Sequence, residues 1–127
     1  MIRGLDSITL FSGNAKKLAE FYEKKVGLKN TGVYEMGDKG EEAYMYEFKK
    51  GSGFSILDNS KVKGKNKNPE RFLFNLEVDD IKKEVPRLKK AGVKVVAEIY
   101  HVEGYGWLAT FEDLDGNYFQ LVQVRAS

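Results

Sequence analysis

The sequence contains one histidine, His101, which is the first candidate for acid–base chemistry. Imidazole titrates near neutral pH, so His101 could act as a general base. Glu103 could orient it, because residues two apart in a strand point to the same side. The loop signal Gly104-Tyr105-Gly106 follows at once, however, and an exposed histidine at a strand end is the commoner arrangement. His101 and Glu103 are therefore candidate catalytic residues, and the alternative is that they are exposed residues at a strand end without a catalytic role.

The same inventory restricts metal chemistry. The absence of cysteine removes disulfides and thiolate zinc sites. A single histidine cannot supply a two-histidine-one-carboxylate triad or a His-x-x-x-His pair within one chain. We therefore expect no cofactor, and no metal held by one chain.

Length and composition describe one ordinary globular domain. The chain has 127 residues, of which 42% are hydrophobic and 31% charged, with a formal net charge of +2. The apolar runs have the length of strands, and neither a membrane span nor a signal peptide is evident. We expect a cytoplasmic protein without membrane or nucleic-acid partners. The lysine-containing segment 59–70 is interpreted as a solvated linker, with a basic binding patch as the alternative.

The elements that must position these residues follow a repeated order. In the first half, a strand at Leu5 to Ser12 precedes an amphipathic helix from Ala15 to Val26 that ends at Gly27. Three extended segments follow, at roughly 29–37, 41–50 and 52–58.

The second half repeats this order. It predicts a strand at Phe72 to Val78, an Asp79-Asp80 cap, a helix at Ile81 to Ala91, and extended segments at roughly 93–102, 105–112 and 117–124. Pro86 conflicts with this helix, so either the first turn is separate or the helix is kinked.

Two offsets support a duplication. Leu10 and Leu76 differ by 76 − 10 = 66, and the endings at Phe54 and Phe119 differ by 119 − 54 = 65. The predicted fold is α+β, with tandem βαβββ modules, each a curled mixed sheet with one helix on its outer face, forming a cleft. Module one covers about 1–58, a linker 59–70, and module two about 71–127.

Several short words in this order resemble the glyoxalase, bleomycin-resistance and extradiol-dioxygenase superfamily, also called vicinal oxygen chelate proteins. They are Ile8-Thr9-Leu10, Phe21-Tyr22, Val26-Gly27-Leu28, Val78-Asp79-Asp80, Ala91-Gly92-Val93 and Phe111-Glu112-Asp113-Leu114-Asp115-Gly116-Asn117. The last resembles the Asp-Pro-Asp-Gly-Asn turn of many relatives, with Leu114 in the place of proline. Independently of the resemblance, Asp113 and Asp115 are expected to bond turn amides rather than to act as acid or base.

The resemblance also implies where a metal would bind. In metal-using relatives four side chains, mainly His and Glu, face the cleft, and their places fall on Ser7, Ser55, Leu73 and Gln120. The offsets 73 − 7 = 66 and 120 − 55 = 65 agree with the repeat. Hydroxyl and amide groups are poor donors for divalent transition metals, and leucine offers none. We expect these positions to bind no metal.

Strand alternation indicates what lines the cleft. If Gln120 faces it, Tyr118 does too, while Phe119 and Leu121 face the helix. The predicted ligand-binding residues are Ser7, Thr9, Ser55, Asn75, Trp107, Tyr118 and Gln120. Aromatic residues that could add to the wall, without a derived facing, are Tyr44, Tyr46, Tyr100 and Trp107; Trp107 suits a core equally well. The residues expected in the core are Phe54, Phe72, Phe74, Phe119 and Leu121.

Two functional hypotheses remain. The first is a metal-free protein that binds a small neutral or aromatic organic ligand, as the bleomycin-resistance branch does. The alternative is a lyase or isomerase that uses His101, Glu103 or Glu77, or a metal completed across a dimer. A homodimer is expected in either case, because exposed strand edges in small α+β domains are commonly covered by association.

Overall fold

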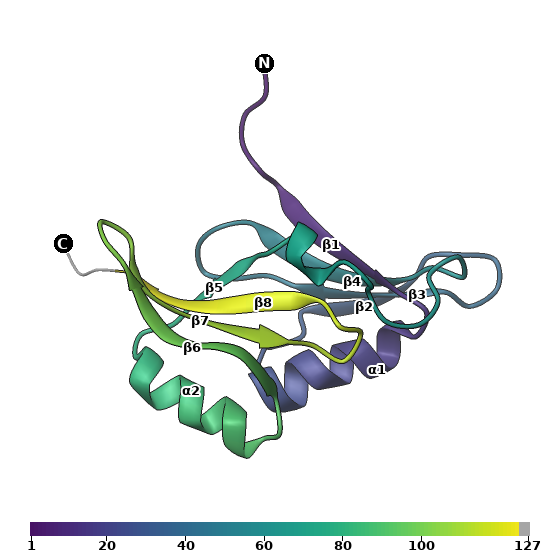
Figure 1. The fold of residues 1–127 in the computed structure, drawn as a ribbon. Coiled ribbons are helices and arrows are strands. Elements are labelled where there is room, and N and C mark those ends of the chain that lie inside the picture. The colour runs from purple at the N-terminus through teal and green to yellow at the C-terminus, as the bar shows by residue number, and fades with distance from the viewer. Residues whose placement is uncertain (125–127) are drawn as a thin grey trace. The chain divides into compact units, whose positions relative to one another are not determined.

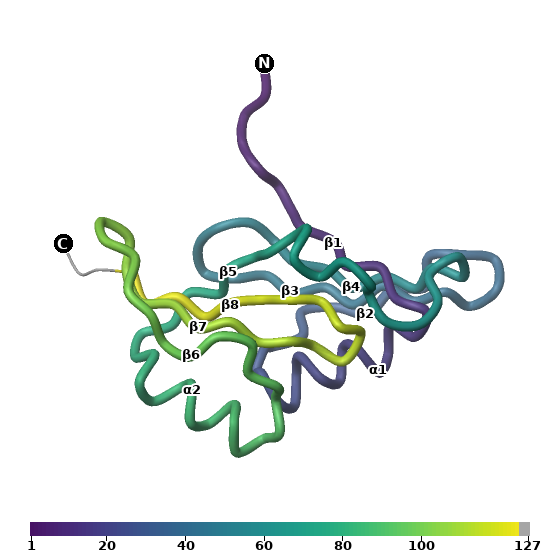
Figure 2. The backbone as a smooth tube through the Cα atoms, viewed as in Figure 1, coloured from purple at the N-terminus to yellow at the C-terminus, as the bar shows by residue number. Residues whose placement is uncertain are grey.

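The computed structural model describes residues 1–124, which form two compact units divided between Gly64 and Lys65 (Figures 1 and 2). Each unit contains one helix-bearing βαβββ module with its own four-stranded mixed sheet. The predicted α+β fold with tandem βαβββ modules is thus confirmed. No helix in the described part of the chain is both long enough and apolar enough to cross a bilayer.

The first unit follows the predicted order. Its elements are β1 (Ser7–Ser12), α1 (Ala15–Glu20), the π-helical segment η1 (Phe21–Val26), β2 (Gly32–Glu35), β3 (Glu42–Tyr46) and β4 (Gly53–Asp58). The sheet order is β1-β4-β3-β2, with β1 parallel to β4 and the other pairs antiparallel. The helical region ends at Gly27, where the predicted left-handed conformation occurs at φ 100°.

The second unit repeats the topology. A short 3₁₀ turn, η2 (Pro69–Arg71), precedes β5 (Asn75–Glu77), α2 (Ile81–Lys90), β6 (Lys94–Val102), β7 (Gly106–Glu112) and β8 (Tyr118–Val124). The sheet order is β5-β8-β7-β6, with β5 parallel to β8. The outer strands of the two sheets are β1, β2, β5 and β6, and the homodimer that could cover such edges stays a prediction.

Each sheet packs its helix against one face. In the first unit the rings of Tyr22 and Phe54 meet edge to face, with centroids 5.5 Å apart. In the second unit Phe111 and Phe119 stack at 5.7 Å beside the buried helix residues Ile81, Val85 and Leu88. Of the predicted core residues, Phe54, Phe74, Phe119 and Leu121 are buried as expected.

One local prediction was wrong, and two questions that the sequence left open are resolved. Phe72, expected in the core, is 49% exposed and lies outside the sheet, since β5 begins only at Asn75. Tyr44 and Tyr46 pair in register with Ile56 and Phe54, which places both on the helix-bearing face rather than in a ligand wall. Helix α2 continues through Pro86 as one element rather than beginning after a separate turn.

The start of each helix is bonded to a side chain of the last strand of its own unit. The Ala15 N–H donates to Asp58 Oδ1 at 2.8 Å, and the Ile81 N–H donates to Gln123 Oε1 at 2.9 Å. The offsets are 81 − 15 = 66 and 123 − 58 = 65, so both copies of the repeat use the same bond. Asp80 is the N-cap residue as predicted, but its side chain makes no cap bond, and the acceptor for the Ile81 N–H is Gln123.

Asp58 should therefore matter for stability. It also accepts a bond from the Glu42 N–H at 2.9 Å, so Asp58→Ala removes the acceptor of two backbone donors. We expect a loss of about 1–3 kcal/mol in the free energy of unfolding, measured in urea. Gln123→Ala should cost about 1 kcal/mol, whereas Gln123→Glu keeps an acceptor. Asp38, which is exposed in a turn, provides the control. If Asp58→Ala lowered the free energy of unfolding no more than Asp38→Ala, the two bonds to Asp58 would not contribute as proposed.

The buried tyrosines predict a loss of stability at alkaline pH. Burial, reinforced by a 2.8 Å bond from Tyr44 Oη to Glu42, raises the pKa of Tyr44 to about 12. Burial and the 2.7 Å bond to Glu23 raise the pKa of Tyr46 further. Above about pH 10 the unfolded chain loses these protons before the native protein does, so stability falls with rising pH. The combined Tyr44→Phe and Tyr46→Phe variant should lose less stability between pH 10 and 12, measured by urea unfolding. If the free energy of unfolding of the double variant fell with pH as steeply as that of the wild type and of Tyr34→Phe, this explanation would be refuted.

Candidate functional site

The face of each sheet opposite its helix, called here the helix-free face, carries the candidate site residues. In the second sheet Gln123 contacts the start of α2, so its face bears the helix. Alternation along β8 then places Gln120 and Tyr118 on the helix-free face. Thr110 and Asn75 pair in register with Gln120 and share that face.

A neutral hydrogen-bonded cluster is centred on Gln120. Its Nε2 donates to Tyr100 Oη at 2.6 Å and to Thr110 Oγ1 at 2.8 Å. Gln120 and Thr110 are only 5% and 7% exposed, whereas Tyr100 is partly open to solvent. Both amide hydrogens of Gln120 are thus satisfied by hydroxyl groups, as burial of an amide requires.

A second hydrogen bond connects the edge strand β5 with the turn between β6 and β7 of the same sheet. Asn75 Nδ2, on β5, donates to Tyr105 Oη at 3.0 Å, and Tyr105 lies in the turn between β6 and β7. Because β8 and β7 separate β5 from β6 in the sheet, the turn must fold over the helix-free face. Figure 1 shows the tip of the β6–β7 hairpin curving away from α2.

Two features of the hairpin account for this curvature. The pairing of β6 with β7 shifts register between Val95 and Ala97 and again between Ala97 and Tyr100, and such bulges bend a strand and increase its twist. At the tip, a side chain in the place of Gly106 would collide with the backbone carbonyl of Gln123. The hairpin can therefore pack closely on β8 only with glycine at this position.

The first sheet carries a smaller polar pair on its helix-free face. Thr9 Oγ1 and Ser55 Oγ are 2.8 Å apart across the parallel β1–β4 pairing. Ser7 lies two residues before Thr9 on the same face and is exposed. Phe11 and Leu57 are register partners on this face and supply apolar surface. The predicted residues Ser7, Thr9 and Ser55 thus share one face.

The positions tested for a metal do not fit one. Ser7 and Ser55 offer hydroxyls, Gln120 offers an amide that bonds two hydroxyls, and Leu73 is an exposed apolar residue before β5. Among residues 1–124 no group of three or more His, Cys, Asp or Glu side chains could hold a metal ion. These donor types are unsuited to a divalent transition metal.

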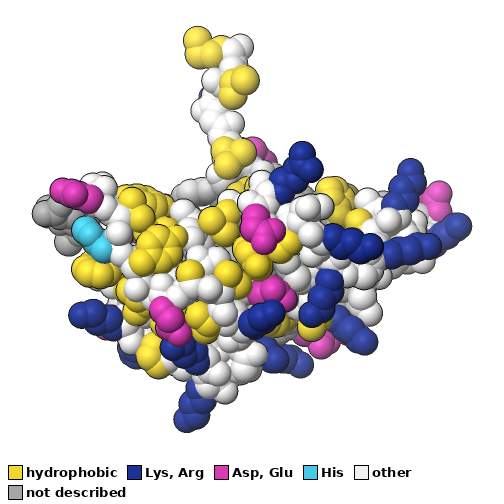
Figure 3. Space-filling view, viewed as in Figure 1, with side chains coloured by type: hydrophobic (Ala, Val, Ile, Leu, Met, Phe, Trp, Pro, Cys, Tyr) yellow, Lys and Arg dark blue, Asp and Glu magenta, His cyan; other side chains and the backbone are white. Residues whose placement is uncertain are grey.

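The structure does not bring His101 to this cluster. His101 pairs in register with Trp107, and Trp107 with Gln123, so both rings lie on the helix-bearing side of the sheet. Their centroids are 4.5 Å apart, and Trp107 is 43% exposed. The exposed histidine is visible as the cyan side chain in Figure 3. Glu103 lies in the exposed turn that follows.

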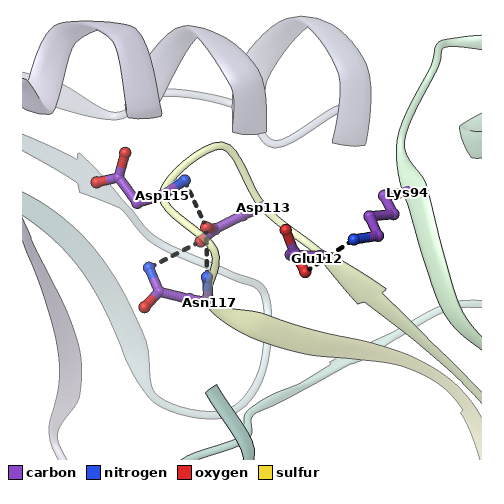
Figure 4. Close-up of polar contacts among 5 residues, drawn as sticks. All are labelled: Lys94, Glu112, Asp113, Asp115 and Asn117. Atoms are coloured by element: carbon purple, nitrogen blue, oxygen red, sulfur yellow. Dashed lines mark hydrogen bonds and ion pairs between the residues drawn. The ribbon is translucent and has the colours of Figure 1, made fainter. Parts of the chain in front are cut away.

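The β7–β8 hairpin that carries Thr110 and Gln120 is fixed by Asp113. Its Oδ1 accepts from the N–H groups of Asp115 and Asn117, both at 2.9 Å, and its Oδ2 accepts from the Asn117 amide at 3.1 Å (Figure 4). The expectation that Asp113 bonds turn amides is confirmed. Glu112, which directly precedes Asp113, forms an ion pair with Lys94, with Nζ and Oε1 3.6 Å apart.

A depression elsewhere has a different character. It encloses about 410 Å³ near the start of α2 and is lined by Glu77, Val78, Asp79, Asp80, Lys83 and Glu84. Its carboxylates come from exposed or half-exposed residues, which solvate readily without a ligand. The buried polar groups around Gln120 are the stronger candidate, because burying polar groups requires specific partners.

Sequence reasoning missed Thr110 and Tyr105 as site residues. The facing of Thr110 follows from strand alternation once the register of β7 against β8 is known. The sequence predicted the strand but not this register. Tyr105 carries no such signal, because the direction of a turn side chain depends on the bulges in β6.

Comparison with known proteins agrees with this architecture. Residues 4–121 match the Glyoxalase/Bleomycin resistance protein/Dioxygenase superfamily, while no curated protein matches the chain. Among solved structures, TnmS3, an antibiotic binding protein from Streptomyces sp. CB03234, is 23% identical with a TM-score of 0.72 and coverage of 98% of each chain. The trypanothione-dependent glyoxalase I of Leishmania major is 18% identical with a TM-score of 0.76, covering 96% of this chain and 87% of that one. The fosfomycin resistance protein FosX of Listeria monocytogenes is 19% identical with a TM-score of 0.69, covering 100% and 95%.

At these identities the solved structures establish a shared fold and nothing more. The family match, in contrast, spans nearly the whole chain and agrees with the tandem modules and with the Asp113 turn. The chain therefore belongs to the glyoxalase/bleomycin resistance protein/dioxygenase superfamily.

Proposed function

We propose that this protein binds a small neutral organic ligand and does so without a metal ion. The observation that carries the proposal is the composition of the cluster at Gln120, where an amide and two hydroxyls satisfy one another. Binding sites for small organic molecules combine apolar surface with a few placed polar groups. Leu108 and Val122 are the apolar neighbours of the cluster on the same face of the sheet, and both are buried.

Electrostatics favours a neutral ligand over a charged one. The cluster holds no ionised group, and the carboxylate of Glu112 on the same face is paired with Lys94. Glu77 lies on the outer strand β5 and is exposed to solvent. A charged ligand at Gln120 would lose hydration without gaining a counterion, which is costly in a buried place.

The composition of the Gln120 cluster favours the binding role over acid–base catalysis, because the cluster contains an amide and hydroxyls but neither a carboxylate nor an imidazole. The location of His101 points in the same direction. As a general base it would have to reach a ligand from the helix-bearing side of the sheet, opposite to Gln120. We therefore propose binding, and not acid–base catalysis by His101 and Glu103.

A screen of uncharged aromatic compounds by thermal shift tests the binding role. A compound that binds only the native protein must raise its melting temperature. For a compound found this way, Tyr118→Ala should weaken binding by about 0.5–1.5 kcal/mol beyond simple burial, because stacking area is lost. Gln120→Glu should weaken it as well, because it places a charge in a buried position. Tyr34→Ala, an exposed tyrosine of the first unit, is the control. If neither Tyr118→Ala nor Gln120→Glu changed the affinity for the compound, the ligand would bind elsewhere.

The same assay tests the metal-free character. Zinc, nickel, manganese and iron, each added in excess over the protein, should leave the melting temperature unchanged. Gln120→Glu should not create metal binding, because one carboxylate beside Leu73 is an insufficient ligand set. Stoichiometric transition metal in protein purified without chelator, and lost in Gln120→Ala, would disprove this part of the proposal.

A further inference from the structure

Two side-chain amides lie next to each other on the helix-free face of the second sheet. Asn75 and Gln120 are register partners in the parallel strands β5 and β8, whose backbones are separated by about 4.8 Å. Each amide donates an N–H to the hydroxyl of a tyrosine, Tyr105 for Asn75 and Tyr100 for Gln120. Both tyrosines come from the same β6–β7 hairpin. The two amides are thus arranged to donate to two oxygen atoms carried by aromatic rings.

The two tyrosines are held very differently. Tyr100 belongs to β6, pairs in register with Leu108, and bonds a buried amide. Tyr105 belongs to a three-residue turn, is 39% exposed, and bonds an exposed amide. The turn is closed by one backbone bond, from the Tyr105 N–H to the Val102 carbonyl at 3.0 Å. Opening the Tyr105 contact would disturb no ladder hydrogen bond, whereas removing Tyr100 would leave a buried amide hydrogen without its acceptor.

We propose that Asn75 is a ligand subsite which Tyr105 occupies in the free protein. The ligand places a phenolic or carbonyl oxygen where the Tyr105 hydroxyl now accepts the Asn75 N–H, and Tyr105 acts as a built-in competitor. This inference rests on the proposed binding function and adds to it the group that the ligand presents and the residue that opposes its binding. Tyr100 remains in place and keeps the Gln120 amide oriented.

The direction in which the ligand affinity changes on truncation distinguishes a competing residue from one that only contacts the ligand. A residue that only contacts the ligand loses affinity when it is truncated. A residue that occupies the subsite lowers the fraction of protein competent to bind, and its removal raises the apparent affinity. One hydrogen bond in a folded protein corresponds to a factor of roughly 2 to 12 in an equilibrium constant. Tyr105→Phe should therefore tighten binding by a factor within this range.

The probe is p-cresol, which has the same ring and hydroxyl as the tyrosine side chain, and toluene is its matched control without the hydroxyl. Binding is followed in wild-type protein and Tyr105→Phe through the side-chain NH₂ resonances of Asn75 and Gln120 in ¹H–¹⁵N spectra. Tyr105→Phe should bind p-cresol roughly 2- to 12-fold more tightly than the wild type. Toluene, which offers Asn75 no acceptor, should bind each protein more weakly than p-cresol does, and Tyr34→Phe should behave as the wild type. Asn75→Ala should abolish the preference for p-cresol over toluene.

A readout without any ligand separates the subsite from the binding function. In ligand-free protein, Tyr105→Phe should shift the Asn75 NH₂ resonances and leave those of Gln120 in place, because only the Asn75 bond is lost. Unchanged Asn75 resonances would overturn the proposed contact. Unchanged or weaker p-cresol binding in Tyr105→Phe would overturn the competition, even if compounds from the aromatic screen bind at Tyr118 and the binding function stands. Tyr105→Ala, which removes the whole ring, provides a second test; p-cresol that fails to shift Asn75 there overturns the subsite itself.

Discussion

The parallel pairing of the first and last strands of each module is the constraint on which the other features depend. A parallel pair needs a crossover connection, and here the connection includes the helix and two further strands. The crossover is closed by one side chain from the last strand, Asp58 or Gln123, which accepts the N–H at the start of the helix. This bond connects the start of the helix to the face of the sheet that the helix covers. Alternation then determines the facing of the residues in the regular strands, including Gln120 and Tyr118, whereas the bulged strand β6 departs from it.

Strand β8 shows how closely the fold and the candidate site are linked. Gln123 bonds the helix, and Gln120, three residues earlier, faces the opposite side. The same strand thus anchors α2 with one glutamine and carries the polar cluster with another. A shift of register by one residue would exchange the two faces and destroy both functions at once. The Asp113 turn at the start of β8 opposes such a shift, because its three accepted bonds set where the strand begins.

The features that sequence could predict are those set locally or by repetition. The 65- and 66-residue offsets, the Gly27 helix end and the Asp113 turn each depend on residues close in sequence or on the duplication. The errors arose where distant residues decide the outcome. Asp80 is the N-cap residue as predicted, but the bond to the Ile81 N–H comes from Gln123, 42 residues after Ile81. Tyr105 reaches Asn75 because bulges in β6 bend the hairpin, and no periodic pattern marks a bulge in advance.

The hydrogen bonds of Gln120 themselves explain why its surroundings suit a neutral ligand. An amide this deeply buried must pair both hydrogens, and Tyr100 and Thr110 accept them. Each hydroxyl, having accepted from Gln120, still carries a hydrogen that it can donate, and the amide carbonyl still can accept. The groups that remain for a ligand are therefore neutral donors and one neutral acceptor. Divalent transition metals are held by anionic or basic donors, so the arrangement that satisfies Gln120 is unsuited to hold one. The chemistry of this face follows from satisfying one buried amide within the sheet.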